Sequence, residues 1–279
     1  MTSSNTTFRS KYGPWALVAG ASVGLGAEFA RQLAARGLNL VLIARRAELL
    51  AERAKELSQA YGIQVRTITF DLGNTDLQSA LCESTRDLDV GLLVYNAAHE
   101  LIGPFLEQEL EEQLKIIDVN CRAPLVLAHE FGRRMATRGR GGILLMSSLA
   151  GHQGSALIAT YAASKAYNRV LGEGLWDELR EHGIDVLAFS AGATRTPNYE
   201  ASQPRKTGSL GPPVMEVEEV ASEALAALGK RPSAVAGRVN RVAGFLMGRL
   251  LPRRVAVETI GRQTRAMYAR RQVAPDGTR

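Results

Sequence analysis

The stretch Trp15-Ala-Leu-Val-Ala19-Gly20-Ala-Ser-Val-Gly24-Leu-Gly26 decides the fold class of this chain. Its opening apolar run predicts a buried strand, and the pattern over 27–36 predicts a helix. The glycines between them let the backbone approach a pyrophosphate, and the start of the helix offers N–H groups with a partial positive charge. The stretch therefore predicts a phosphate-binding turn, with a tight strand–helix connection that holds no ligand as the alternative.

Further strand patterns follow this turn and alternate with helical patterns. They cover 38–43, 63–70, 90–95, 142–146 and 184–189, with an edge strand at 233–237. Buried strands separated by helices indicate a parallel sheet covered on both faces. We therefore expect an α/β fold, a Rossmann-type doubly wound parallel sheet in three layers, with a C-terminal helical extension.

Length and composition suit a single catalytic domain with two additions. The chain has 279 residues, of which 46% are hydrophobic. Residues 1–12 are polar and predict a flexible arm. Residues 13–238 are expected to form the dinucleotide-binding and catalytic domain. Residues 239–279 are expected to form a basic helical extension packed on or near that domain. Two cysteines form no disulfide framework, and neither a signal peptide nor a long apolar run is visible. The expected compartment is the cytoplasm, with peripheral membrane contact as an option.

The excess of basic over acidic residues is confined to the C-terminal part of the chain. The net charge is +6, but residues 230–279 alone hold twelve basic and two acidic residues, a balance of +10. The helical patterns over 238–251 and 253–271 are amphipathic, with apolar residues on one side and arginines on the other. They predict a cover over the substrate cleft or a subunit contact. Alternatively, they contact an anionic membrane or an acidic acyl carrier. Nucleic acid is not an expected partner, because no reading module accompanies the charge.

The end of the second predicted strand indicates the cofactor. An acidic residue at this place would bind the 2′-hydroxyl of the adenosine ribose, whereas an arginine suits a 2′-phosphate. The strand runs into Ala44-Arg45-Arg46 and the acid is missing. This favours NADP(H) over NAD(H), unless the arginines only begin the next helix.

Polar residues follow other strands at the edge where open α/β sheets hold their ligands. Asp71 and Asn96 lie there, next to Leu72 and Ala97. His99 has no second metal ligand nearby, so no metal site is expected. Asn120 falls inside a predicted helix over 107–137, where its amide needs a partner such as a water that leads to Lys165.

Tyr161 and Lys165 are four residues apart, which places both side chains on one face of a helix. A nearby ammonium group would stabilise the tyrosine phenolate and make the hydroxyl useful for proton transfer. Ser148 ends a predicted strand thirteen residues earlier, where its hydroxyl can hold a substrate oxygen. The alternative is a tyrosine that packs on the sheet beside a solvated lysine.

After the strand at 184–189 comes Ser190-Ala-Gly192-Ala-Thr194-Arg-Thr196, and then a loop over 198–214 that is rich in Gly, Pro and Ser. A loop of this length inside a compact domain predicts a lid, in which Tyr199 faces the substrate.

Together these motifs resemble the short-chain dehydrogenase/reductase family, from Trp15 to Gly237. The glycine turn resembles T-G-x-x-x-G-x-G with Ala19 in place of Thr, and Asn96-Ala97 matches the middle of N-N-A-G. The stretch 191–196 resembles P-G-x-x-x-T, with Ala191 in place of proline. The family's Asn-Ser-Tyr-Lys set falls on Asn120, Ser148, Tyr161 and Lys165.

The resemblance implies hydride transfer between a nicotinamide and a carbonyl or alcohol carbon. It implies that Tyr161 exchanges the proton, Ser148 binds the oxygen, Lys165 lowers the tyrosine pKa and holds the nicotinamide ribose, and Asn120 anchors a water relay. It also implies a homodimer or homotetramer that pairs through the helix of Tyr161. With the reasoning above, it assigns the cofactor to Gly20, Ser22, Val23, Gly24, Leu25, Gly26, Arg45, Asp71, Leu72, Asn96, Ala97, Tyr161, Lys165, Gly192, Thr194 and Thr196.

The expected function is an NADP(H)-dependent reductase or dehydrogenase that acts on an apolar or acyl-type substrate. The alternative is a regulatory or scaffold protein that binds NADP(H) without turnover, because a fold alone does not guarantee activity.

Overall fold

The computed structural model describes residues 3–204 and 213–268. Its centre is a seven-stranded sheet in the order β3-β2-β1-β4-β5-β6-β7, and every adjacent pair of strands is parallel. The strands are β1 (Trp15–Ala19), β2 (Asn39–Ala44), β3 (Val65–Thr69), β4 (Val90–Tyr95), β5 (Gly141–Ser148), β6 (Ile184–Ala191) and β7 (Ser233–Val235). The predicted doubly wound fold is confirmed.

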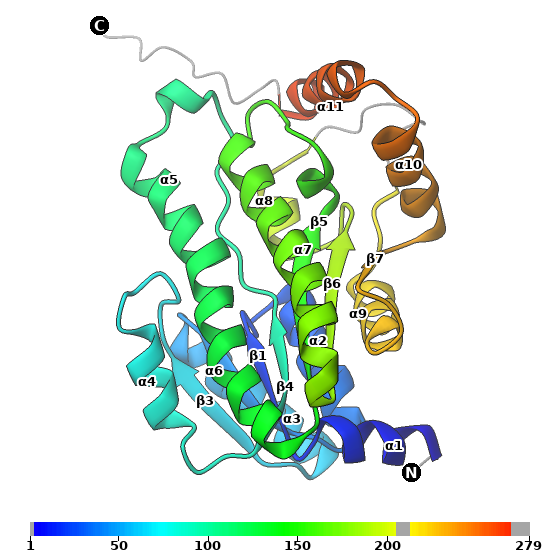
Figure 1. The fold of residues 1–279 in the computed structure, drawn as a ribbon. Helices are drawn as coiled ribbons and strands as arrows, with labels where there is room; N and C mark the ends of the chain where they lie inside the picture. Colours follow the sequence, from blue (N-terminus) through cyan, green and yellow to red (C-terminus); the bar gives the residue numbers. More distant parts are fainter. Residues whose placement is uncertain (1–2, 205–212, 269–279) are drawn as a thin grey trace, which may run out of the picture.

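Helices cover both faces of the sheet and produce three layers (Figure 1). One core cluster joins the sheet to α2 (Gly24–Ala35), α3 (Ala47–Tyr61) and α9 (Val217–Ala227). The other joins it to α4 (Leu77–Ser84), α6 (Ala123–Arg138) and α7 (Ala159–Leu179). Along β1, Ala16 and Val18 enter the first cluster and Leu17 and Ala19 the second, because successive strand side chains point to opposite faces.

The strand order places a ligand cleft. The chain leaves β1 toward β2 on one side and later returns to add β4 on the other, so the order reverses between β1 and β4. At such a switch point the connections that follow the two strands diverge and leave a crevice at their carboxyl ends. The glycine turn follows β1, and Asn96 follows β4 at this edge.

The N-terminal arm differs from the expectation of a flexible segment. Ser3–Tyr12 forms the helix α1, and Tyr12 is buried. Its ring contacts Phe8 edge to face at 4.6 Å, and its hydroxyl donates a hydrogen bond to the Asp185 carboxylate. Phe8 and Tyr12 are four residues apart, so a helix presents both rings to the core together. The segment looked mobile because its polar residues outnumber this aromatic pair.

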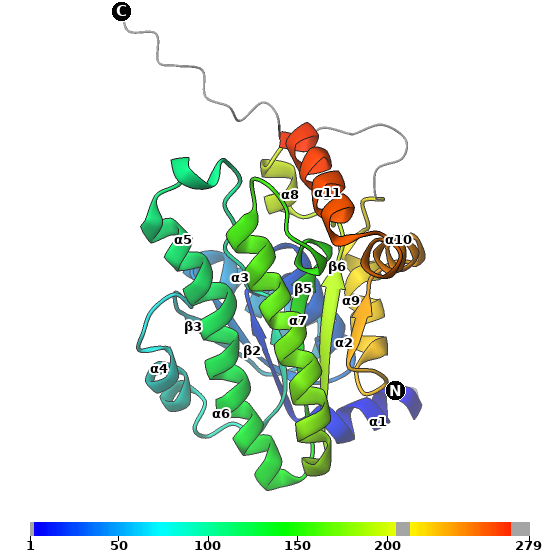
Figure 2. The same cartoon turned by 45° about the horizontal axis from the view of Figure 1, so that its top comes forward.

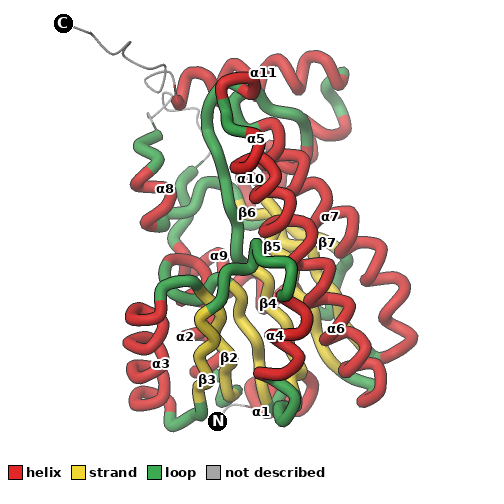
Figure 3. The backbone as a smooth tube through the Cα atoms, turned by 90° about the vertical axis from the view of Figure 1, so that its left-hand side faces the viewer, coloured by secondary structure: helices red, strands yellow, loops and turns green. Residues whose placement is uncertain are grey.

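Three helices gather above the carboxyl end of the sheet (Figures 2 and 3). They are α8 (Pro197–Ala201), α10 (Arg238–Arg249) and α11 (Arg253–Tyr268). The lid predicted over 198–214 is described in part, since residues 205–212 lie outside the described residues. Among the described helices, none is both long and apolar enough to cross a bilayer.

Candidate active site

A cleft of about 810 Å³ opens at the carboxyl ends of the strands. Fifteen of the predicted cofactor residues line it, and Gly26 lies just behind its wall. Ser148, Tyr161 and Lys165 form part of the floor, whereas Asn120 is fully buried beside it. Tertiary folding therefore gathers the predicted residues from six separate stretches of chain.

The glycine turn is closed around its own backbone. A Cβ on Gly26 would lie 2.0 Å from the Gly20 carbonyl oxygen, and Gly20 has a φ of +82°. A Cβ on Gly24 would approach Thr196 at 3.2 Å, which shows how near the turn after β6 comes. Glycine is required at these places, since any side chain would push the loop open.

The start of α2 suits an anion. Its N-cap residue, Val23, makes no side-chain capping hydrogen bond, and the first turn of the helix holds no acidic residue. The N–H groups of the first turn thus keep their partial positive charge for a ligand. A dinucleotide pyrophosphate fits this cradle of small residues and helix N–H groups.

The second anion position lies beyond β2. Arg45 and Arg46 are both exposed at the cleft, and the Arg46 Nη2 donates a hydrogen bond of 3.2 Å to the Ser22 hydroxyl. Two guanidinium groups without a carboxylate at the strand end fit a 2′-phosphate on the adenosine ribose. The described residues therefore fit NADP(H) in both its pyrophosphate and its ribose phosphate.

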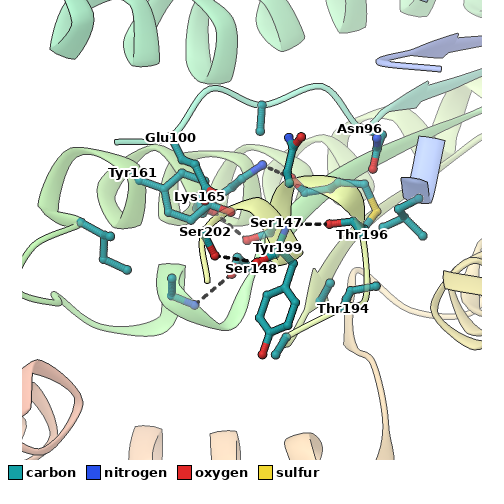
Figure 4. A pocket seen from close by; sticks show the side chains of 18 of the residues that line it. Asn96, Glu100, Ser147, Ser148, Tyr161, Lys165, Thr194, Thr196, Tyr199 and Ser202 are labelled. Carbon is teal, nitrogen blue, oxygen red and sulfur yellow. Dashed lines mark hydrogen bonds between the residues drawn. The ribbon is translucent and has the colours of Figure 1, made fainter. Parts of the chain in front are cut away.

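Tyr161 and Ser148 form the chemical centre (Figure 4). The hydroxyl of Ser148 forms a side-chain hydrogen bond with Tyr161 and also accepts the Ala150 N–H at 3.2 Å. Burial and the Glu100 carboxylate raise the pKa of Tyr161, and the hydrogen bond with Ser148 opposes them. On balance the pKa of Tyr161 is raised, because burial disfavours the phenolate more than the hydrogen bond with Ser148 stabilises it.

Lys165 is buried with its Nζ 5.6 Å from the centre of the Tyr161 ring. The Nζ donates a hydrogen bond of 3.2 Å to the Met146 carbonyl oxygen. Burial lowers the pKa of Lys165 to about 8, although the charge of Glu100 raises it. The lysine is thus a cation that titrates near neutral pH, directly under the tyrosine.

Asn120 has a different environment from the one expected. The predicted helix over 107–137 divides into α5 (Leu110–Ile117), a π-helical segment (Asp118–Arg122) and α6. The Asn120 amide exchanges hydrogen bonds of 2.8 and 2.9 Å with the His99 backbone and donates one of 2.9 Å to Ser164. The Asn168 side-chain amide donates a hydrogen bond of 2.9 Å to the backbone carbonyl oxygen of Asn120. The side chain therefore fastens the loop after β4 to α7.

The remaining strand-end residues lie where the pattern predicted. Asn96 reaches the Gly20 carbonyl oxygen at 3.4 Å, and Asp71 accepts the Gly73 N–H at 3.0 Å. Thr196 caps α8 by accepting the Tyr199 N–H at 3.1 Å, and Tyr199 lines the cleft as expected. His99 pairs with Glu112 at 2.8 Å. Within the part of the chain that the structure describes, no cluster of three metal-ligating side chains occurs.

Several residues of the cleft had no signal in the sequence. They lie on loops or on the C-terminal helices and comprise Glu100, His152, Gln153, Ser155, Asn240 and Thr264. The hydroxyls of Ser155 and Thr264 share a buried hydrogen bond of 2.7 Å, and Arg253 donates to the His152 carbonyl oxygen at 3.0 Å. These bonds fasten α11 to the loop after β5. Of these residues, Glu100 lies only three positions after the Asn96-Ala97 motif, so its place near the cleft could have been inferred from that motif.

The sequence is similar to those of known proteins. The family model for short chain dehydrogenase matches residues 14–207. A 7beta-hydroxysteroid dehydrogenase of Clostridium sardiniense is 34% identical over 234 residues, which cover 84% of this chain and 89% of that protein. A very-long-chain 3-oxoacyl-CoA reductase of Pyricularia oryzae is 39% identical over 187 residues, which cover 65% of this chain and 56% of that protein.

Two solved structures are also similar. The structure of a 7beta-hydroxysteroid dehydrogenase has a TM-score of 0.83 at 28% identity and covers 91% of this chain and 98% of its own. A short-chain dehydrogenase from Sphingobium yanoikuyae in complex with NADPH has a TM-score of 0.73 at 32% identity, and the match covers 85% of this chain and 94% of that chain. With the family model matching well over half of its length, this chain belongs to the short-chain dehydrogenase family and is an NAD(P)-dependent oxidoreductase that acts on CH–OH and C=O groups.

Proposed function

We propose that this protein is an NADP(H)-dependent reductase or dehydrogenase of a mainly apolar carbonyl or alcohol substrate. The observation that carries the proposal is the hydrogen-bonded pair of Tyr161 and Ser148 on the floor of the cleft, with the buried Lys165 beneath it. This arrangement offers a proton and a second hydrogen bond to one substrate oxygen.

The cofactor, when bound, would supply or accept the hydride. Tyr161 and Ser148 hold the substrate oxygen, and in reduction Tyr161 gives it the proton that the new alcohol needs. The raised pKa of Tyr161 keeps its hydroxyl protonated at neutral pH, which suits a general acid. In oxidation the same oxygen of Tyr161 takes the proton back. Lys165 supplies the positive charge beside the phenol and would hold the nicotinamide ribose.

Asn120 acts as a positioning residue in this proposal. Its amide holds the backbone at His99 against α7, which keeps the loop after β4 next to the cleft. The backbone carbonyl oxygen of Asn120 accepts the hydrogen bond from Asn168 and has a second lone pair for the predicted water relay. We therefore assign its effect on activity to loop placement and to this relay.

Preference for NADP(H) rests on Arg45 and Arg46 at the end of β2, and NADPH is bound in the related Sphingobium yanoikuyae enzyme. The substrate class rests on the cleft walls, where apolar side chains of Ile102, Ile158, Ile260 and Met267 surround the centre. The related proteins are described as acting on a hydroxysteroid and on very-long-chain 3-oxoacyl-CoA. Large apolar substrates agree with such walls.

Pairing of two copies is proposed along α5 and α7. Leu110, Leu114 and Val170 are exposed there, and a shallow apolar groove runs along α7 from Ala163 to Glu178. Light scattering during gel filtration would measure the assembly. A monomer at all concentrations would remove this part of the proposal.

The function is tested by mixing the protein with NADPH or NADH and a panel of hydroxysteroids, their ketones and 3-oxoacyl thioesters, while the nicotinamide absorbance is recorded. We expect turnover of at least one apolar ketone, faster with NADPH than with NADH. Binding of NADPH without turnover of any member would contradict the proposal and favour a regulatory binding protein.

A further inference from the structure

The two C-terminal helices present an apolar surface away from the cleft. Phe245, Leu250 and Val242 are 61%, 65% and 59% exposed, although helices of globular domains normally bury such residues. The surface, here called the outer face, consists of Val242, Phe245, Leu246, Leu250, Leu251, Val255 and Val257, none of which lines the cleft. Leu246 and Leu250, which the sequence placed on the apolar side of α10, are exposed, and Val239 is exposed as well as lining the cleft.

Arginines surround the outer face. Arg238, Arg241 and Arg249 lie on α10, and Arg253 and Arg254 begin α11. Arg241 pairs with Glu223 at 3.0 Å and Arg254 with Glu258 at 2.8 Å, whereas within the described residues Arg238, Arg249 and Arg253 have no carboxylate partner. The described residues 230–268 hold nine basic residues and one acidic residue, a balance of +8, so positive charge dominates in this part of the chain.

The opposite side of the same helices lines the cleft. Ala243 and Gly244 of α10 and Ile260, Gln263 and Thr264 of α11 contribute to the cavity wall. Figure 2 shows both helices above the carboxyl end of the sheet. One layer of helix therefore separates the outer face from the substrate.

We propose that the outer face docks on the surface of an anionic lipid bilayer, with α10 and the start of α11 lying in the interface. Exposed Phe, Leu and Val side chains would enter the headgroup region while the arginines contact lipid phosphates. The cleft would then lie one layer of helix away from the lipid. The docking itself does not depend on the proposed function, whereas the access of apolar substrates from the bilayer does.

A second copy of the chain is a less suitable occupant. A two-fold contact would bring the same arginines of both copies together, and like charges repel at short range. The face along α5 and α7 is different, because Leu110, Leu114 and Val170 expose apolar area without such a ring of arginines. The molecule thus offers one apolar face for self-association and a separate, basic one for an anionic surface.

The test is sedimentation with vesicles of phosphatidylcholine alone or mixed with phosphatidylserine, at low and high salt. We expect binding only to the anionic vesicles, and much weaker binding at high salt because ions screen the arginines. Replacing both Phe245→Ser and Leu250→Ser should weaken binding by roughly tenfold or more. Neither residue lines the cleft, so NADPH binding should be unchanged and would report an intact fold.

The matched control is Leu106→Ser, which removes a side chain that is 93% exposed in the short 3₁₀ helix Phe105–Glu107 before α5. It should leave vesicle binding unchanged. Absence of binding to anionic vesicles by the unaltered protein would overturn the proposal. Loss of dimers, rather than of vesicle binding, in the Phe245→Ser, Leu250→Ser protein would overturn it in favour of a second copy. Vesicle binding without turnover would remove only the proposed function.

Discussion

The two halves of the cleft are built by different means. The half that fits the cofactor is backbone: glycines in close contact, helix N–H groups and the ends of buried strands. The half that fits the substrate is side chains from α10, α11 and loops, joined by bonds such as that between Ser155 and Thr264. The cofactor half therefore tolerates no added side-chain atoms at its glycines, whereas the substrate half can exchange the side chains that line it without loss of the fold.

The largest effect is expected where the halves meet. Tyr161→Phe removes the hydroxyl that is proposed to give its proton to the substrate oxygen, so turnover should fall by about 10²- to 10⁴-fold. NADPH binding should persist, as measured by fluorescence titration. Tyr167→Phe on the same helix is the control, and it should leave turnover nearly unchanged. Near-normal turnover in the Tyr161 variant would remove this residue from the chemistry.

A smaller but still large effect is expected in the cofactor half. Gly26→Ala would place a Cβ 2.0 Å from the Gly20 carbonyl oxygen, so the turn must open and the phosphate cradle widen. We expect NADPH affinity to fall by roughly 10²-fold, since a backbone cradle loses several contacts together. Gly154→Ala meets nothing within 4 Å and serves as the control. Equal affinities in the two variants would contradict the rigid cradle.

The next effect concerns the choice of cofactor. Arg45→Ala removes one of two guanidinium groups at the ribose end of the cleft. We expect about tenfold weaker binding of NADPH and little change for NADH, because only NADPH carries the 2′-phosphate. Arg140→Ala, exposed and outside the cleft, is the control. A parallel loss for both cofactors would show that Arg45 does not read the phosphate.

In the substrate half, Thr264→Val leaves the buried Ser155 hydroxyl without its partner. The free energy of unfolding should fall by about 1 to 3 kcal/mol. The KM for an apolar substrate should rise several-fold while NADPH affinity is kept. Thr137→Val removes an exposed helix threonine that bonds only to the backbone, and it should change neither. A loss of NADPH affinity would mean that the halves are not independent.

The smallest effect is a shift in pH dependence. The carboxylate of Glu100 raises the pKa of both Tyr161 and Lys165. Glu100→Gln should therefore lower both values. In reduction, activity should decline as Lys165 loses its proton near pH 8, and in the variant this decline should move to lower pH. The pH at which the oxidation rate rises should also move to lower pH in this variant. Glu107→Gln is the control and should change the pH dependence of neither reaction. A shift to higher pH would contradict the sign.

Before the structure was known, the strand patterns and the glycine turn already indicated the sheet, because buried parallel strands and phosphate turns need apolar runs and glycines at fixed places. The set of Asn120, Ser148, Tyr161 and Lys165 was also visible, and three of its members meet in the cleft. The water relay predicted at Asn120 stays a prediction, whereas its contacts with the His99 backbone and Ser164 depend on a π-helical segment and a loop that no local pattern encodes.

The sequence by itself determined the sheet and the glycine turn, since each depends on residues close together in the chain, and it named the side chains proposed to react. Only the tertiary structure decided that α1 packs on the core, that burial raises the pKa of Tyr161, and that α10 and α11 line the substrate half while exposing an apolar face. Burial, long-range charge and the sharing of one cleft by distant helices are properties of neighbours in space, and amphipathic periodicity cannot say which side of a helix faces them.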